Sequence, residues 1–500
     1  MAIYSTFKYG SGTKWGASTL TTLRWAIQID WFDTNFAEGI NEAPRCIACD
    51  WERGRDTFLE TPTTGIRFPS VGRATVTLDN NDRLYDPRNA NGEYYGYISP
   101  GHRARIGVRT PYSGTSVQWR LTGRVTDITP SGWRNGYVDI VIEDALQWLY
   151  DQDIDIDVQQ LIRIDEAIAQ VLSTAAWPWA SDLAISADSL QYWWAESKAS
   201  SEIADLTASG IGYFSVLGDG TARYLNRADV TASPINLTDD NTLNNPRVAQ
   251  PWENYKNSIR VRWYPKQLQA SDIIWSDISV PVMIVPGGTY TTYGDYAYNG
   301  ISCPALSATV GTADYSVNSA SDGSGTDISA NFSVSLTDFG ASAKLIVTNN
   351  GLVTGYVMLL QINGQAITTP YTGSSIDNRL DYATNPRTWT LELPWQQTSG
   401  RAEAIAGIMA DYMAAERTWP TITMENRFDV QFGADIFDTL RYTSNYLGID
   451  DSFRVGKIRE RWMSDNGQAV QTTYILEPYV PGTVAWTWPI TDFGTDTIFG

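Results

Sequence analysis

The sequence contains a single histidine and only three cysteines, and this scarcity excludes several kinds of site. Because His102 is the only histidine, sites with two histidine ligands are excluded, and a Ser-His-Asp or Cys-His site would have to use it. Cys46 and Cys49 have the spacing of zinc ligands, and Cys303 with His102 would complete a set of four. The pair stands, however, in the strand-like run RCIACDW, where residues three apart point to opposite faces. We therefore expect buried cysteines and a histidine at the start of a strand, with no metal, no cofactor and no catalytic residue.

Long hydrophobic runs are also missing. The first residues, MAIYSTFKYG, lack the charged and then apolar regions of a signal peptide. The longest apolar runs, such as YVMLLQI, are far too short to cross a bilayer. These features predict a chain that is made in the cytoplasm and carries no membrane anchor.

Positive charge is scarce, with 36 basic against 56 acidic residues and a formal net charge of −20. The acidic residues are spread along the chain. This balance disfavours nucleic acid or an anionic membrane as a tightly bound partner, because both require basic patches. An acidic surface can still line a passage for DNA, since it repels phosphates and prevents sticking.

A chain of 500 residues is expected to fold as several units. Residues 1–148 contain runs in which apolar and polar residues alternate, such as RATVTLDN and GYVDIVIED, separated by turn residues. This pattern predicts a first antiparallel barrel. Residues 149–227 have apolar residues at helical spacing and then a hairpin pattern at YFSVLGDGTARYLNR, which predicts a small α+β domain.

The second half of the chain is again strand-like, with one helical segment at Gly400–Trp419. Residues 267–395 are rich in Ser, Thr, Gly and Asn, which predicts an inserted β-sandwich. If Glu253–Pro265 pairs with the C-terminal strands, residues 228–266 plus 396–482 form a second barrel that is split around the insertion. Residues 483–500 would be a C-terminal arm. The prediction is a mainly β, multi-domain fold.

The acidic stretch DNNDRLYDP invites three interpretations: a calcium loop, a catalytic pair or a turn. Counted from Asp79, an EF-hand would need Gly and Glu where the sequence has Leu84 and Ala90. Asp and Asn side chains commonly accept hydrogen bonds from the backbone two residues on, and Pro87 would stop strand pairing. We therefore interpret the stretch as a turn that follows a strand.

Aromatic residues are abundant, and the 20 tryptophans raise the alternative of a glycan-binding protein. Many tryptophans lie in or beside apolar runs, which favours roles in cores and subunit interfaces. Glycan cleavage would require two carboxylates across a cleft, and no pair is singled out. The carboxylates of Asp151–Asp157 alternate and would share one solvated strand face. A glycan-binding surface within residues 267–395 stays open as the alternative.

Several motifs, in one order, resemble the minor tail proteins of tailed phages and prophages. They are GRATVTLDNNDRLYDPRN, YYGYISPGHRARIGV, WRLTGRVTDITP with VDIVIEDALQWL, YFSVLGDGTARYLNR, ENYKNSIRVRW, and ADIFDTLRYT with FRVGKIRERW. The resemblance covers nearly the whole chain apart from residues 267–395. It is to the baseplate hub or tail-tip members of siphophages.

The resemblance implies a non-enzymatic virion protein at the tail tip. It implies two tube-like β-barrels per subunit and a homotrimeric ring that continues the tail tube. The implied partners are the distal tail protein, the tail tube and the tape-measure protein, with room for a central fibre or receptor-binding proteins, and with phage DNA passing only transiently. The residues expected to carry the signature or a subunit interface are Asp79, Asn80, Asp82, Asp86, Pro87, Tyr94, Tyr95, Pro100, Gly101, Trp486 and Trp488.

Deleting Trp486–Gly500 is expected to leave folding intact and to impair ring or tail assembly, because this segment is expected to contact a neighbouring subunit. Particle yield measures the effect. A wild-type yield from the deletion variant would contradict this role.

Overall fold

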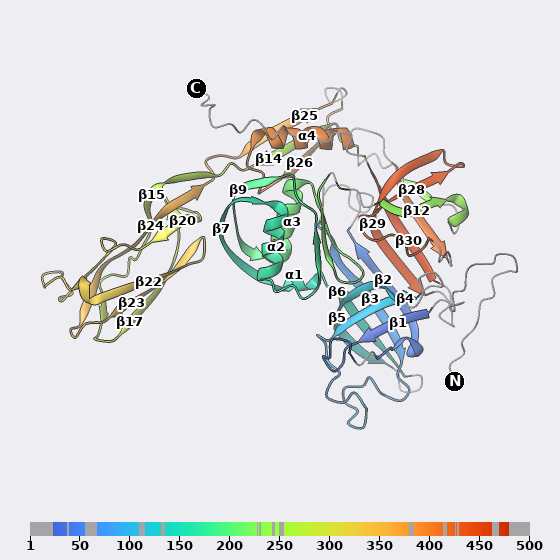
Figure 1. Cartoon of the computed structure of the whole chain (residues 1–500), viewed down its shortest axis with the longest axis horizontal. Helices are drawn as coiled ribbons and strands as arrows, with labels where there is room; N and C mark the ends of the chain where they lie inside the picture. Colours follow the sequence, from blue (N-terminus) through green and yellow to red (C-terminus); the bar gives the residue numbers. More distant parts are fainter. Residues whose placement is uncertain are drawn as a thin grey trace.

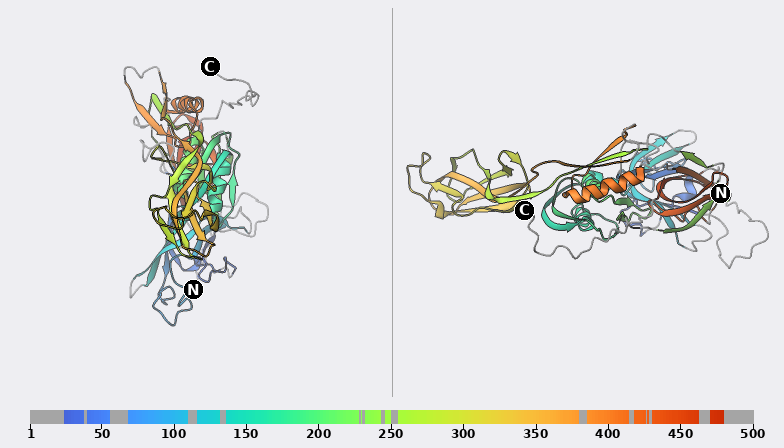
Figure 2. Two further views of the ribbon diagram at one scale, coloured as in Figure 1. Left: turned by 90° about the vertical axis from the view of Figure 1, so that its left-hand side faces the viewer. Right: turned by 90° about the horizontal axis from the view of Figure 1, so that it is seen from above.

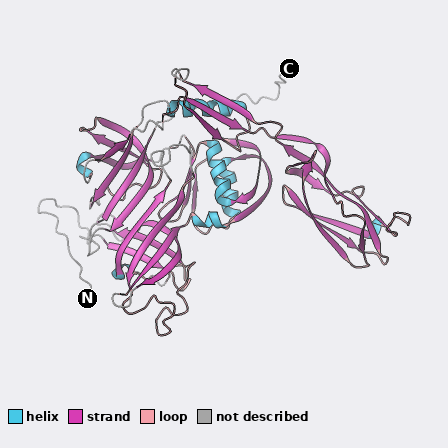
Figure 3. Cartoon of the chain, turned by 180° about the vertical axis from the view of Figure 1, so that it is seen from behind, coloured by secondary structure: helices cyan, strands magenta, loops and turns pink. Residues whose placement is uncertain are grey.

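The computed structural model describes most of the chain, and strands dominate it (Figure 3). The described residues are 24–37, 40–55, 68–109, 116–131, 136–227, 229, 232–242, 246–249, 255–379, 385–413, 418–425, 427, 430–462 and 470–479. The prediction of a mainly β, multi-domain fold is confirmed. Within these residues, no helix is long and apolar enough to cross a membrane.

The largest sheet combines strands from the two ends of the chain (Figure 1). Its main order is β1 (Arg24–Ile29), β4 (Arg103–Arg109), β5 (Gln118–Ser131), β6 (Tyr137–Asp144), β3 (Ser70–Asp79), β2 (Cys46–Gly54), β29 (Ile449–Trp462), β30 (Val470–Pro478), β27 (Trp419–Glu425) and β13 (Arg247–Ala249). β28 (Thr439–Ser444) pairs with β29, and β12 (Ala232–Thr238) pairs with β28. The two β-rich regions thus form one 12-stranded sheet.

The prediction of two separate tube-like barrels is therefore wrong in one respect. Neither half closes on itself, because β2 hydrogen-bonds to β3 on one side and to β29 on the other. A β-strand edge leaves backbone N–H and C=O groups unpaired, and pairing β2 with β29 satisfies both edges at once.

Each half of the sheet covers its own hydrophobic core. In the N-terminal half the alternation seen in the sequence sends Ala74, Val76 and Leu78 of β3 inward, and all three are fully buried. The C-terminal half buries a second cluster, which includes Ile458 of β29 and Tyr474 of β30. The period of two along each strand therefore sets which face is apolar.

An α+β body follows the N-terminal half along the chain. Its elements are α1 (Gln147–Asp151), β7 (Asp153–Arg163), α2 (Ile164–Thr174), β8 (Ser181–Leu183), β9 (Ser189–Lys198), α3 (Ala199–Gly210), β10 (Tyr213–Val216) and β11 (Ala222–Leu225). β7 pairs with β9, and α2 and α3 pack beside them around a shared core. The carboxylates of Asp153, Asp155 and Asp157 all face solvent, as the alternating sequence predicted.

Another small sheet lies under α4 (Ser399–Met413). In it β14 (Ser258–Trp263) pairs with β25 (Gly373–Asn378) on one side and with β26 (Thr388–Glu392) on the other. The pairing of Glu253–Pro265 with the C-terminal strands, which was the condition for a split second barrel, is therefore not found for β14. β14 leads into the inserted segment and β25 leads out of it, so pairing them closes the base of the insertion with short connections.

The insertion itself is two packed sheets that project from the rest of the molecule (Figures 1 and 2). One contains β15 (Gln267–Ser276), β24 (Gly355–Thr368), β16 (Val282–Ile284), β20 (Ala305–Thr309) and β21 (Tyr315–Asn318). The other is β17 (Thr289–Asp295), β23 (Ser342–Asn349) and β22 (Phe332–Asp338), and a short pair is β18 (Ala297–Tyr298) with β19 (Ile301–Ser302). Both sheets contribute to one apolar core.

Candidate assembly surface

The seam, defined as the paired residues Asp50–Gly54 of β2 and Lys457–Arg461 of β29, joins the two halves of the sheet. The two strands approach closely at Gly54, whose φ of 121° is a conformation that residues with a side chain rarely adopt. A Cβ atom at this position would lie 2.4 Å from the backbone oxygen of Gly456. Glycine is therefore required where the two strands come together.

Ion pairs between buried arginines and carboxylates lie on the inner side of the seam. They are Arg120–Glu460 at 2.6 Å, Arg53–Asp435 at 2.6 Å, Arg223–Asp438 at 3.0 Å, and Arg55–Glu477. Three of these pairs join a residue before position 121 to one after position 434. These pairs connect segments that are distant in sequence, so they fix how the two halves meet.

The positions of Glu460 and Arg53 follow from the alternation along their strands. On β29, Trp462 belongs to the N-terminal core and Ile458 to the C-terminal core, and Glu460 lies between them on the same face. Arg53 likewise follows Trp51 on the inner face of β2. The ion pairs therefore form a polar belt between two hydrophobic cores. Such buried pairs add little net stability, but breaking one is costly because a charge is left unpaired.

Within this polar belt, Asp435 contacts both an arginine and the backbone of the α+β body. Its Oδ2 accepts a hydrogen bond from the Gly218 N–H at 3.2 Å, while its Oδ1 contacts Arg53. Desolvation alone would raise the pKa of Asp435, but the guanidinium groups of Arg53 and Arg120 lower it overall. The carboxylate therefore stays charged and holds the loop at Gly218, which belongs to the α+β body, against the seam.

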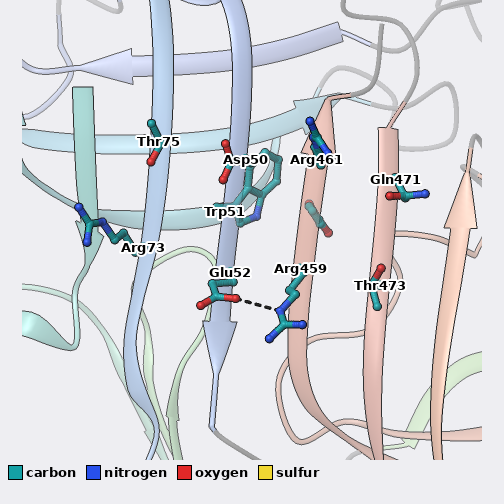
Figure 4. A pocket seen from close by; sticks show the side chains of 10 residues that line it. Asp50, Trp51, Glu52, Arg73, Thr75, Arg459, Arg461, Gln471 and Thr473 are labelled. Carbon is teal, nitrogen blue, oxygen red and sulfur yellow. Dashed lines mark hydrogen bonds and ion pairs between the residues drawn. The ribbon is translucent and has the colours of Figure 1, made fainter. Parts of the chain in front are cut away.

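The outward face of the seam is polar and carries both signs of charge. Directly paired residues on neighbouring strands share a face. One such row crosses the sheet in the order Arg124, Glu143, Arg73, Glu52, Arg459 and Thr473. Glu52 accepts a hydrogen bond from Arg459 at 2.9 Å (Figure 4). An open hollow of about 380 Å³ lies over the part of this row from Arg73 to Thr473.

Two other buried carboxylates have strongly raised pKa values. Burial raises the pKa of Asp144 to about 7, even though its carboxylate accepts hydrogen bonds from the backbone of Gly72 and Leu146. Burial likewise raises the pKa of Glu202 to about 7, against the hydrogen bond from Trp193 Nε1 at 2.7 Å. These groups bind protons in the folded chain at a pH where the unfolded chain has released them.

Asp144→Asn is expected to stabilise the chain at pH 8 and to change little at pH 4. Between the unfolded pKa of about 4 and the folded pKa, the folded state holds a proton that the unfolded state lacks, so wild-type stability falls as pH rises through this window. The gain at pH 8 is expected to be about 1–3 kcal/mol, measured by urea unfolding. Glu93→Gln, which changes an exposed carboxylate, is the control; an equal gain from it would contradict the burial argument.

The signature loop, residues 79–101, lies at one end of the N-terminal half (Figure 1). Its Asp and Asn side chains accept backbone N–H bonds two residues on, as predicted: Asp79 from Asn81, Asp82 from Leu84, and Asp86 from Arg88. Within the described residues, no group of three or more His, Cys, Asp or Glu side chains is arranged to hold a metal.

Glu42 holds the signature loop in place through hydrogen bonds from two of the loop's tyrosines. No sequence motif indicated this role. Its buried carboxylate accepts hydrogen bonds from Tyr85 OH, from Tyr94 OH at 3.5 Å and from Trp31 Nε1 at 3.1 Å. Burial raises the pKa of Glu42, although these donors and Arg45 oppose the shift. Arg45 also binds Asp82 at 2.8 Å, so the loop is tied to the start of β2 at two points.

The other candidate residues fall into two groups. Asn80, Asp86 and Tyr94 are buried supports, whereas Pro87, Tyr95, Pro100 and Gly101 are exposed. Trp486 and Trp488 lie outside the described residues, so their role stays a prediction. The interface role of the exposed residues is likewise a prediction that the single chain does not test.

Cys46 and Cys49 lie within hydrogen-bond distance of each other, but within the described residues no third ligand joins them. Cys49 and Cys303 are buried in different cores, and Cys46 is partly buried. His102 is buried just before β4, where its Nδ1 lies 3.2 Å from Asp33 Oδ1 and its Nε2 lies 3.2 Å from Ser99 Oγ. The position of His102 at the start of a strand matches the expectation.

The fold and this surface define a mainly β scaffold built on one continuous sheet with a projecting β-sandwich. No family model and no curated protein sequence matches the chain. Among solved structures, the chain is similar to the 43 kDa tail protein of prophage MuSo2 from Shewanella oneidensis, with a TM-score of 0.50, 10% identity, and coverage of 91% of this chain and 99% of that one. It therefore has the fold of a prophage tail protein.

Two further structures show weaker similarity. The tail protein from Neisseria meningitidis MC58 has a TM-score of 0.48 and 9% identity, with coverage of 91% of this chain and 96% of that one. The prophage tail protein gp18 from Listeria monocytogenes EGD-e has a TM-score of 0.41 and 8% identity, with coverage of 86% and 87%.

Proposed function

We propose that the chain is a structural, non-enzymatic subunit of a bacteriophage tail tip, where three copies form a baseplate-hub ring that continues the tail tube. The observation that carries the proposal is the seam, because it converts two β regions into one uninterrupted wall. Three such walls around an axis would enclose a passage. The buried ion pairs fix the geometry of this wall, and a ring that continues the tail tube requires subunits of fixed geometry.

In this proposal the polar outward face of the seam lines the passage. A permanent protein interface usually has an apolar centre, and this face instead has alternating arginines, carboxylates and hydroxyls. Balanced charge of this kind holds water and gives passing DNA no basic patch to bind. The ring would join the distal tail protein and the tail tube at its rims, and the tape-measure protein would reach its interior.

Native mass spectrometry of the purified chain tests the ring. We expect a complex of three times the 55.5 kDa chain mass, which associates with tail-tube components. A monomer without affinity for those components would contradict the proposal.

Cysteine labelling tests which face lines the passage. In assembled tails, Thr473→Cys on the outward face is expected to react far more slowly with a bulky polyethylene-glycol maleimide than it does in the free chain. Tyr446→Cys, on an exposed turn between β28 and β29, is the matched control and should react equally in both. Equal labelling of Thr473→Cys before and after assembly would place this face outside the passage.

A further inference from the structure

The sheet of β17, β23 and β22 has an outer face rich in Ser and Thr on the projecting insertion. Along β23, Ala343, Leu345 and Val347 are fully buried, so the residues between them point outward. The strand register then defines three outward rows that span all three strands, which we call the hydroxyl face: Thr289, Thr348 and Ser333; Thr291, Ile346 and Ser335; Tyr293, Lys344 and Thr337. The exposed Asp295, opposite Ser342, follows at one end of these rows.

Six of these nine side chains are Ser or Thr, and each hydroxyl can donate one hydrogen bond and accept others. Among the described residues, the only bond to any of these six that the structure shows is from Asn350 to Ser333, at 2.9 Å. Their hydroxyls therefore keep most of their bonding capacity for water or a ligand.

One aromatic ring stands on this face. Tyr293 is 67% exposed, and its ring lies 5.9 Å from Lys344 Nζ. An exposed tyrosine offers an apolar ring face together with a polar hydroxyl. The C–H side of a sugar ring can pack on the tyrosine ring. The hydroxyls of the sugar can form hydrogen bonds with the tyrosine hydroxyl and with the neighbouring Ser and Thr side chains.

The charge of the insertion narrows the ligand class. Between Gln267 and Pro370 the sequence has seven aspartates, one lysine, and no glutamate, arginine or histidine. That lysine, Lys344, lies within the hydroxyl face, none of the nine residues is acidic, and Asp295 lies in the row beside them. A single cation does not suffice for nucleic acid or anionic lipid, which require basic clusters.

We propose that the hydroxyl face binds a neutral glycan. A protein partner fits the surface less well, because the centres of protein interfaces are apolar and depleted in serine, whereas this face has one aliphatic side chain among nine. The insertion projects away from the 12-stranded sheet, so a glycan could reach it without entering the proposed passage (Figures 1 and 2). Glycan binding on this face is thus separate from ring formation.

Affinity electrophoresis of the full-length protein tests the proposal, with dextran, mannan, galactan and mixed β-glucan as neutral probes and hyaluronate as a polyanion. We expect at least one neutral polysaccharide to retard the protein. Tyr293→Ala should weaken that retardation at least tenfold, and Thr337→Val should weaken it two- to fivefold. Tyr446→Ala removes a tyrosine that is even more exposed than Tyr293, from another part of the chain, and should bind like wild type.

Three results would overturn the proposal: no retardation by any neutral probe, retardation by hyaluronate alone, or equal retardation of wild type and Tyr293→Ala. A tail protein that co-purifies with wild type and Tyr446→Ala but not with Tyr293→Ala would show that the face is a protein interface instead. Circular dichroism of each variant separates lost binding from lost folding. Ring mass, measured on the same samples, reports on the proposed tail function independently.

Discussion

Replacing Gly54 with alanine is expected to open the seam and to destabilise the chain by about 2–5 kcal/mol. Two causes add. Alanine is strained at a φ of 121°, and its Cβ would overlap the Gly456 oxygen at 2.4 Å and the Lys457 Cα at 2.8 Å. Because all of these contacts are backbone atoms of the paired strand, no side-chain rotation relieves the overlap. Urea unfolding measures the loss, and hydrogen exchange at residues 457–461 should show faster exchange across the seam.

Gly96→Ala separates the two causes. Gly96 also has a positive φ, 87°, but a Cβ there would meet no atom within 4 Å. It should therefore show the strain alone, about 1 kcal/mol, with unchanged exchange at the seam. If both variants lose the same stability, crowding at the seam contributes nothing, and the close approach of β2 and β29 is not what requires glycine.

The strand pairing at the seam was not predicted from the sequence. Individual strands follow from local alternation: the run Arg73–Asn80 was expected as a strand and is β3, Ser70–Asp79. The pairing of Asp50 with Arg461 joins residues about 400 positions apart, and alternation carries no information about such a partner. The same limit explains why the sequence left the partner of β14 as a condition, since any exposed strand edge could have received this strand. The five domain boundaries stay predictions.

The candidate site was predictable to a similar extent. The backbone bonds of Asp79, Asp82 and Asp86 follow from side-chain chemistry within two residues, so the sequence sufficed. The contact of Tyr85 with Glu42 spans 43 residues and depends on tertiary packing. One signal for the ion pairs was present: Arg53 stands two residues after Trp51 in β2, at a position where alternation predicts the inner face. Arginine there requires a buried partner.

Arg120→Met is expected to destabilise the chain by about 3–5 kcal/mol, because it leaves the Glu460 carboxylate buried without its counter-charge. Arg120 donates to Glu460 from Nε at 3.0 Å and from Nη2 at 2.6 Å, and to the Phe432 oxygen at 3.5 Å. Urea unfolding measures the loss. Arg441→Met breaks a pair of similar length, Arg441–Asp450 at 2.6 Å, but that pair is on the surface and its loss should leave the unfolding midpoint nearly unchanged.

The double variant Arg120→Met/Glu460→Leu decides whether the pair stabilises the fold or specifies how the two halves meet. Removing both charges also removes both desolvation costs, so its stability should return to within about 1 kcal/mol of wild type. If Arg120→Met alone fails to fold, recovery of folding in the double variant gives the same answer. Should the double variant be as unstable as Arg120→Met, the ion pair itself would be a net source of stability. A further outcome is a double variant that regains stability without regaining ring assembly. In that case the polar belt serves to fix the angle between the two halves of the sheet, because apolar contacts alone do not specify one angle.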